Sequence, residues 1–273
     1  MININSESNT LGVQQMLNGS QGRLESANEK LASGLKINRA SDDAANLAVA
    51  IKYANELAGG NKGLQNSNDA ISMLQVADGG LAAMSDITLR MQELATQSGN
   101  GALSKDDRAT LQGEMQQLQS EMVRIAKTTK FNGISLLADD SQRQFQLGAE
   151  AGNGVALGGI DAASSLGGLG IGSIDLSSTT SSPAALDIIG AAQGYINQNL
   201  AAISANMSRI ESAATSLKVK KENVAAARSR IMDTDYAQEV ANRTSALIQN
   251  QSGQAMLAQA NVSAQPALAM LNS

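Results

Sequence analysis

The chain has 273 residues and contains no Cys, His or Trp, with only 3 Tyr and 2 Phe. It therefore cannot form disulfides, thiolate or imidazole metal sites, or cysteine or histidine catalytic centres, so we expect neither an enzyme nor a cofactor. Its 20 basic and 25 acidic residues leave a net charge of −5, which together with the scarcity of aromatic rings disfavours nucleic-acid binding.

Residues 1–10 lack the basic and apolar regions of a secretory signal peptide. Elsewhere no apolar run approaches the ~18 residues that a membrane-spanning helix requires. These features alone predict a cytoplasmic protein that does not enter a membrane.

A helix with one narrow apolar seam is predicted over residues 10–32. The seam follows heptad spacing through Val13, Leu17, Ser20, Leu24, Ala27 and Leu31. A single apolar seam on an otherwise polar helix must pack against another helix. Residues 33–40 break the pattern, and Ser41-Asp42-Asp43 supplies the capping oxygens and negative charge that begin a new helix.

Two further helices are predicted before the middle of the chain. The first runs from about 43 to 98, is weakened at Gly59-Gly60 and Gly79-Gly80, and ends at Gly99-Asn100-Gly101. The second runs from about 104 to 128, with heptad-spaced apolar residues at Leu111, Met115, Leu118, Met122 and Ile125.

The segment 131–180 has a different pattern. Phe131-Asn132-Gly133 is typical of a tight turn, and Gln144-Phe145-Gln146-Leu147 alternates polar and apolar residues as a strand does. Glycine is dense between Gly148 and Gly172, so short strands and turns are predicted there rather than a helix.

The strongest periodicity lies in the next predicted helix, which begins near Ser181-Ser182-Pro183. Apolar residues recur there at every seventh position and predict a buried core seam: Ile189, Ile196, Ile203, Ile210, Leu217, Val224 and Ile231. A last helix follows Asp233-Thr234-Asp235, with a weaker stripe that includes Val240, Leu247, Ile248 and Val262, and Pro266 is expected to interrupt it.

The fold class predicted from these elements is mainly α: an elongated antiparallel helical bundle or coiled coil with a small β-rich region in the middle of the chain. Both termini would carry helices with incompletely covered seams, which favours a protein that assembles with other copies. The residues alone fit core helices of a monomeric bundle equally well.

Motifs along the chain resemble bacterial flagellin. The matching segments are Asn3-x-Asn5, 31–45, Lys130-Phe131-Asn132-Gly133, Gln146-Leu147-Gly148-Ala149, 227–237 and 257–261. The resemblance covers about residues 1–150 and 181–273, and it implies a short flagellin without the variable outer domains.

The resemblance implies a helical filament used for swimming, built from many copies of this chain. Residues 1–42 and 235–273 would form the inner coiled-coil polymerisation domain, and 43–234 the α/β rod domain, with β-hairpins and a Gly/Ser-rich loop at 131–180. The seam for polymerisation would comprise Val13, Leu17, Leu24 and Leu31 with Val240, Leu247, Ile248 and Val262. Short terminal helices do not offset their own ordering cost, so they are expected to fold on incorporation.

Family membership would also change the expected location and partners. Flagellins leave the cell through the hollow flagellar channel without a cleaved signal peptide, so the resemblance implies an extracellular protein of the bacterial flagellum. The implied partners besides other copies are a flagellar export chaperone, the filament cap and hook-junction proteins.

Arg90, Glu93, Leu94 and Glu114 match positions at which many flagellins contact a Toll-like innate immune receptor. From the residues alone they are ordinary helix residues. Their neighbours Leu89, Met91 and Gln92 differ from the polar and basic residues more common in the family.

Two other functions share some of these features. A hook–filament junction protein has similar termini but forms a short ring layer, and the full matches around 31–45 and 227–237 favour flagellin instead. A cytoplasmic coiled-coil adaptor would be a folded oligomer of small, fixed size.

Overall fold

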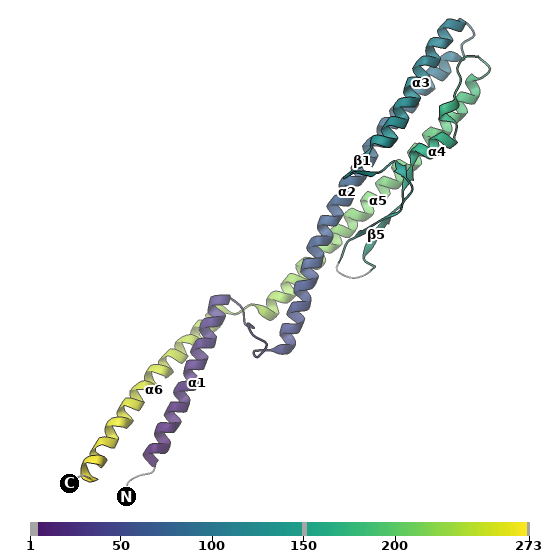
Figure 1. The fold of residues 1–273 in the computed structure, drawn as a ribbon. Helices are drawn as coiled ribbons and strands as arrows, with labels where there is room; N and C mark the ends of the chain where they lie inside the picture. Colours follow the sequence, from purple (N-terminus) through teal and green to yellow (C-terminus); the bar gives the residue numbers. More distant parts are fainter. Residues whose placement is uncertain (1–4, 149–151, 272–273) are drawn as a thin grey trace. The chain divides into compact units, whose positions relative to one another are not determined.

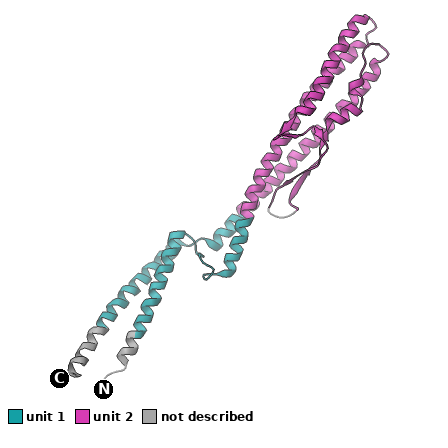
Figure 2. Cartoon of the chain, in the orientation of Figure 1, with its two compact units in different colours: residues 1–55, 223–273 teal, residues 56–222 magenta. Residues whose placement is uncertain are grey.

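The computed structural model describes residues 5–148 and 152–271, with side chains described for 11–148 and 152–259. The described chain is mostly helical, with a few short strands near its middle, which confirms the predicted mainly α class (Figure 1). It divides into two compact units (Figure 2). We call residues 1–55 with 223–273 the terminal unit, and residues 56–222 the central unit.

Three long helices contribute to the core of the central unit: α2 (Ala44–Ser98), α3 (Lys105–Thr128) and α5 (Ser182–Met232). The predicted helices at 43–98 and 104–128 are thus confirmed. Helix α3 begins with a reciprocal capping box between Ser104 and Asp107. Arg108, nearly buried, donates to the carbonyls of Ser98 and Asn100 at 2.8 and 3.1 Å, which neutralises the carbonyl-rich end of α2.

Among the described residues in the middle of the chain, six short strands form three antiparallel pairs. The pairs are β1 (Lys130–Phe131) with β2 (Ile134–Ser135), β3 (Ala138–Asp139) with β6 (Ile160–Asp161), and β4 (Arg143–Gln146) with β5 (Gly154–Leu157). Asn132 and Gly133 both have positive φ, 49° and 79°, as a two-residue type I′ hairpin turn requires. The predicted turn at 131–133 and the strand at 144–147 are confirmed.

The β region approaches α2 closely at Gly63. A Cβ atom at this position would stand 2.1 Å from the carbonyl oxygen of Leu147, so only glycine fits without a shift of the backbone. Next to it, the Asn66 amide donates to the carbonyl of Gln146 at 2.7 Å. The sequence alone gave no reason to distinguish Gly63 from the other helical glycines.

The prediction of strands and turns throughout the glycine-rich segment was wrong at one place. Residues Ala162–Gly168 form a short helix, α4, followed by a 3₁₀ turn, η1 (Ile171–Ser173). The Asp161 carboxylate caps α4 by accepting from the Ser164 amide, and Ala162 and Leu166 are buried. Capping and burial together outweigh the helix-weakening effect of the glycines.

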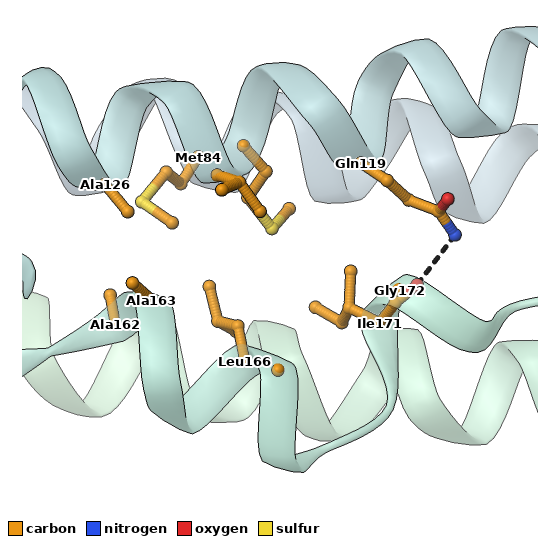
Figure 3. Close-up of a pocket in the computed structure, with 11 residues that line it drawn as sticks. Met84, Gln119, Ala126, Ala162, Ala163, Leu166, Ile171 and Gly172 are labelled. Atoms are coloured by element: carbon orange, nitrogen blue, oxygen red, sulfur yellow. Dashed lines mark hydrogen bonds between the residues drawn. The ribbon is translucent and has the colours of Figure 1, made fainter.

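Two glutamines of α3 hold the segment after α4. Gln119 Nε2 donates to the Ile171 carbonyl at 2.6 Å, as Figure 3 shows, and Gln112 both donates to the Ile174 carbonyl and accepts from the Leu176 amide. Their spacing of seven residues places both on one face of α3. These contacts satisfy backbone groups that no strand partner reaches.

In the terminal unit, α1 (Asn5–Ser33) and α6 (Tyr236–Leu271) lie side by side (Figure 1). They run antiparallel, since Leu17 packs near Gly253 whereas Asn28 accepts a hydrogen bond from Arg243 at 2.8 Å. Helix α6 continues to Leu271, so the prediction that Pro266 interrupts it was wrong.

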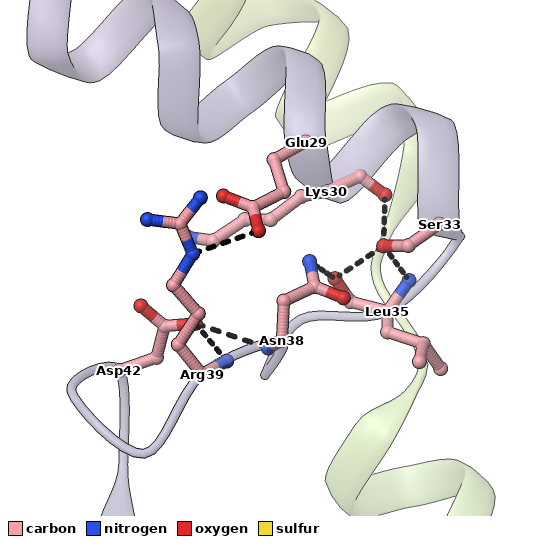
Figure 4. Close-up of polar contacts among 7 residues, drawn as sticks. All are labelled: Glu29, Lys30, Ser33, Leu35, Asn38, Arg39 and Asp42. Atoms are coloured by element: carbon pink, nitrogen blue, oxygen red, sulfur yellow. Dashed lines mark hydrogen bonds and ion pairs between the residues drawn. The ribbon is translucent and has the colours of Figure 1, made fainter.

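The connector between α1 and α2, residues 34–43, is held by polar contacts within the terminal unit. The Asp42 carboxylate accepts from the backbone amides of Asn38 and Arg39, each at 3.0 Å, and Arg39 forms an ion pair with Glu29 (Figure 4). The amide hydrogen bonds, Arg39 first, lower the pKa of Asp42. Gly34 has a positive φ of 70°, where its conformational freedom is required.

Candidate assembly surfaces

Among the described residues of α1 and α6, the side chains that are buried are small or polar. Val13, Leu17, Leu24 and Leu31, predicted from the sequence as part of a polymerisation seam, are only half-buried. Between residues 11 and 33 of α1 the buried side chains are those of Ser20 and Ala27, and between residues 236 and 259 of α6 they are Glu239, Ala246 and Asn250. In the described part of this helix pair, the seam therefore fully encloses no large apolar side chain.

The seam residues predicted on α6 are not among the buried residues of the described part of that helix. Val240, Leu247 and Ile248 are exposed, Ile248 to 57%, whereas the side chain of Val262 lies outside the described residues. Leu11, Met16 and Met256 are exposed as well. With Tyr236, the described part of the terminal helix pair thus presents seven exposed large hydrophobic side chains.

A polar groove of about 340 Å³ lies along one side of the same helix pair. Arg23, Ser26 and Lys30 line it from α1, and Asn242 and Gln249 are among the residues that line it from α6. Asn242 donates to the carboxylate of Glu239 at 3.2 Å, which gives that buried acid a hydrogen-bond partner.

The heptad series of α5 changes its surroundings along the helix. Ile189, Ile196, Ile203 and Ile210 are buried in the core of the central unit, and Leu217 is half-buried. Val224 is half-buried too, and Ile231 packs against a small cluster of the terminal unit formed by Ile37, Ala50 and Met232.

Three of the four predicted receptor-contact residues form one exposed ion-pair cluster. Arg90 contacts Glu93 at 2.8 Å and Glu114 at 2.7 Å, and the hydrogen bonds to Glu93 and then Glu114 raise the pKa of Arg90. Leu94 differs, because it is 1% exposed and belongs to the core of the central unit. Its side chain positions α2 rather than facing solvent.

An apolar pocket of about 100 Å³ lies between α3 and α4 (Figure 3). Met84, Met122, Leu166 and Ile171 are among the residues that line it, and the amide of Gln119 is already engaged with the Ile171 carbonyl. A void lined mainly by apolar groups gives room for packing and supplies few groups that could bind a polar ligand or take part in a reaction.

Asp43, Asp107 and Asp139 act in capping and turns. Asp43 accepts from the Asn46 amide, Asp107 from Ser104, and Asp139 from Ser141. Among the described residues, no group of three or more carboxylates is arranged to hold a metal ion. In the same part of the chain, no helix combines the length and apolar character needed to cross a membrane.

Family models match both ends of the chain. The bacterial flagellin N-terminal helical region matches residues 4–142, and the bacterial flagellin C-terminal helical region matches residues 186–271. The chain belongs to the bacterial flagellin family.

Individual relatives agree with this assignment. A flagellin of Halalkalibacterium halodurans is 39% identical over 256 residues, covering 93% of each chain. The flagellar filament 30.7 kDa core protein of Treponema maltophilum is 35% identical over 283 residues, covering 98% of this chain and 99% of that protein. A crystal structure of Bacillus cereus flagellin superposes with a TM-score of 0.52 at 30% identity, covering 60% of this chain and 94% of that one.

Proposed function

We propose that this flagellin joins its filament through the terminal helix pair, α1 with α6. As a member of the family it is a structural subunit of a flagellar filament, which is a polymer of flagellin chains. The relatives match nearly the whole chain, which does not favour the alternatives of a hook–filament junction protein or a cytoplasmic adaptor.

The observation that carries the proposal is the poor burial of the terminal helix pair. Its seam encloses Ser20, Ala27 and Ala246, while Leu247 and Ile248 remain exposed. Fully burying one Leu or Ile side chain contributes about 1.5–3 kcal/mol, whereas ordering each residue of a helix costs about 1–2 kcal/mol. Neighbouring copies that cover the exposed apolar residues would supply the missing burial.

Folding of these helices on incorporation follows from the same comparison between the free energy of apolar burial and the cost of ordering the chain. In the monomer the pair would be weakly ordered, and at the end of a growing filament it would fold against the copies already present. Nucleation in the cytoplasm would then be rare, because no single monomer offers a folded template. Contacts that repeat head to tail without closing a ring extend into a helical tube.

We assign polymerisation to residues 1–42 and 235–273 and the α/β rod to residues 43–234, with 131–180 in place of the family's outer domains. The polymerisation domain so defined lies inside the terminal unit. We also propose export through the flagellar channel without a cleaved signal peptide, and contacts with an export chaperone, the filament cap and hook-junction proteins. Enzymatic activity is not part of the proposal.

Seeded growth tests the assembly surface. Purified chain is added to short filament seeds beside a variant that lacks residues 1–40 and 235–273, and elongation is followed by electron microscopy. We expect long filaments only from the full chain, with the truncated variant still folded by circular dichroism. Elongation by the truncated variant would refute the assignment.

A matched pair of point variants sharpens that test. Ile248→Gln changes an exposed apolar residue of α6, and Val219→Gln changes one of similar exposure, 57% against 55%, on α5 in the central unit. We expect Ile248→Gln to slow elongation by about ten-fold or more and Val219→Gln to have a much smaller effect. Equal effects would argue against a special role for the terminal helix pair.

The exposed cluster of Arg90, Glu93 and Glu114 supports a second proposal, contact with a Toll-like receptor. Arg124 offers a matched control, because it forms an exposed ion pair with Glu121 on α3. We expect Arg90→Ala to weaken binding of the monomer to a purified receptor ectodomain, whereas Arg124→Ala leaves binding unchanged. If both variants still bind as the natural chain does, the proposed contact is refuted.

A further inference from the structure

Six of the described methionine side chains lie in two contrasting environments. Four of them, Met84, Met91, Met115 and Met122, are at most 1% exposed in the core of the central unit. On the terminal helix pair, Met16 is 74% and Met256 is 62% exposed. A thioether reacts with oxidants at a rate that follows its exposure, so the two groups differ strongly in susceptibility.

The two exposed methionines lie on the same side of the terminal helix pair. Residues seven apart share a helix face, which aligns Met16 with Arg23 and Lys30 on α1, and Met256 with Asn242 and Gln249 on α6. The side chains of Arg23, Lys30, Asn242 and Gln249 line one groove. By this spacing both methionines lie on the groove side of their helices, one heptad beyond residues that line the groove.

They also lie at about the same level along the pair. Leu17, the neighbour of Met16, packs against Gly253, one helical turn before Met256, and a Cβ atom on Gly253 would stand 2.9 Å from Leu17 Cδ1. This is a close approach of the two helices. The methionines flank it, where a neighbouring copy that covers the groove side would contact both.

We propose that Met16 and Met256 form an oxidation site of the unassembled chain, and that their sulfoxides block its addition to the filament. The inference rests on the proposed assembly surface. The reactant is a peroxide: the thioether sulfur attacks one peroxide oxygen, the O–O bond breaks, and the sulfur–oxygen bond forms. With hydrogen peroxide the other oxygen leaves as water, so sulfur loses two electrons and the peroxide gains them.

The product changes the surface in a way that opposes assembly. A sulfoxide is polar and accepts hydrogen bonds, whereas the thioether is a flexible apolar group that packs into irregular gaps. Burying two sulfoxides against a neighbouring copy leaves polar oxygens without solvent. Within a filament the same thioethers would be covered, so protection against peroxide is expected after assembly.

Peroxide treatment of the purified monomer tests the inference. Peptide mapping by mass spectrometry measures sulfoxide at each methionine, and seeded elongation is measured on the same sample. We expect Met16 and Met256 to oxidise at least about ten-fold faster than the four buried methionines, and elongation to fall by about five-fold or more. Enzymatic reduction of the sulfoxides should restore elongation.

The Met16→Leu/Met256→Leu double variant is the control, because it keeps every other methionine and an apolar surface. We expect it to elongate after peroxide as it does before. Normal elongation of the oxidised natural chain, loss of elongation by the oxidised double variant, or no recovery on reduction would each overturn the inference. Failure of the untreated natural chain to elongate would instead refute the proposed assembly surface, and the inference would fall with it.

Discussion

Heptad patterns occur in both units of this chain, yet they bury different side chains. In the central unit the α5 seam buries isoleucines against α2, α3 and the β region. In the terminal unit the α1–α6 seam buries serine, alanine and amide or acidic side chains. None of the twelve largest fully buried side chains comes from the described part of the terminal unit.

The difference shows that an apolar seam stabilises a chain only as far as other elements surround it. Several elements cover the α5 seam, so each isoleucine there loses nearly all of its solvent contact. With one partner helix, Leu17, Leu24 and Leu31 of α1 remain partly exposed. The same periodicity therefore forms a stable core in the central unit and a surface suited to further copies in the terminal unit.

Removing a core isoleucine should give the largest loss of stability. We expect Ile196→Ala to lower the free energy of unfolding of the central unit by about 2–5 kcal/mol, because it leaves a cavity in a close-packed core. Val219→Ala, on the exposed side of the same helix, should change it by less than about 0.5 kcal/mol. Denaturant unfolding followed by circular dichroism measures both, and similar values would contradict the contrast in burial.

Adding one methyl group where α2 meets the β region should have a smaller effect. We expect Gly63→Ala to destabilise the central unit by about 1–3 kcal/mol, because its Cβ would collide with the Leu147 carbonyl. Gly79→Ala is the matched control on the same helix, where a Cβ meets open space, and it should stabilise by up to about 1 kcal/mol. Equal melting temperatures for the two variants would refute the predicted close approach.

Acid should weaken the connector of the terminal unit by a small amount. The Asp42 pKa is lowered from its ordinary value of 3.8, chiefly by the Arg39 amide, so the folded form binds its proton less readily than the unfolded form. The stabilisation is therefore complete above pH 3.8 and is lost as the pH falls below it, through the folded pKa. We expect the Asn38 and Arg39 amide signals in an NMR titration to move below pH 3.8 and to stay fixed in Asp42→Asn. A midpoint above 3.8 would contradict the assignment.

Much of the fold could be predicted because it depends on local chemistry. The Asn132-Gly133 turn, the Ser104 cap and the α5 heptads each specify one conformation without knowledge of distant residues. Helix α4 could not be predicted, because its stability comes from the Asp161 cap and from burial of Leu166 against other elements. Tertiary contacts there outweigh the local preference of glycine.

The candidate surfaces were less predictable than the helices that carry them. Periodicity identifies one face of a helix, but it does not say how many elements cover that face, so the exposure of Ile248 and the burial of Leu94 required the structure. Gln112 and Gln119 carried a weak signal, because these two amides, seven residues apart, directly follow the apolar seam residues Leu111 and Leu118 of α3 and can hold an irregular segment. The exposure of Met16 was not evident from its position beside the α1 seam.

Hydrogen–deuterium exchange of the monomer and the filament tests the central claim most directly. In the monomer we predict that amides of α1 and α6 exchange at least about 100-fold faster than those of α5 between residues 189 and 210. In the filament both groups should be protected. Equal protection of the terminal helix pair and of α5 in the monomer would show that the pair is stable without neighbouring copies, and would contradict folding on incorporation.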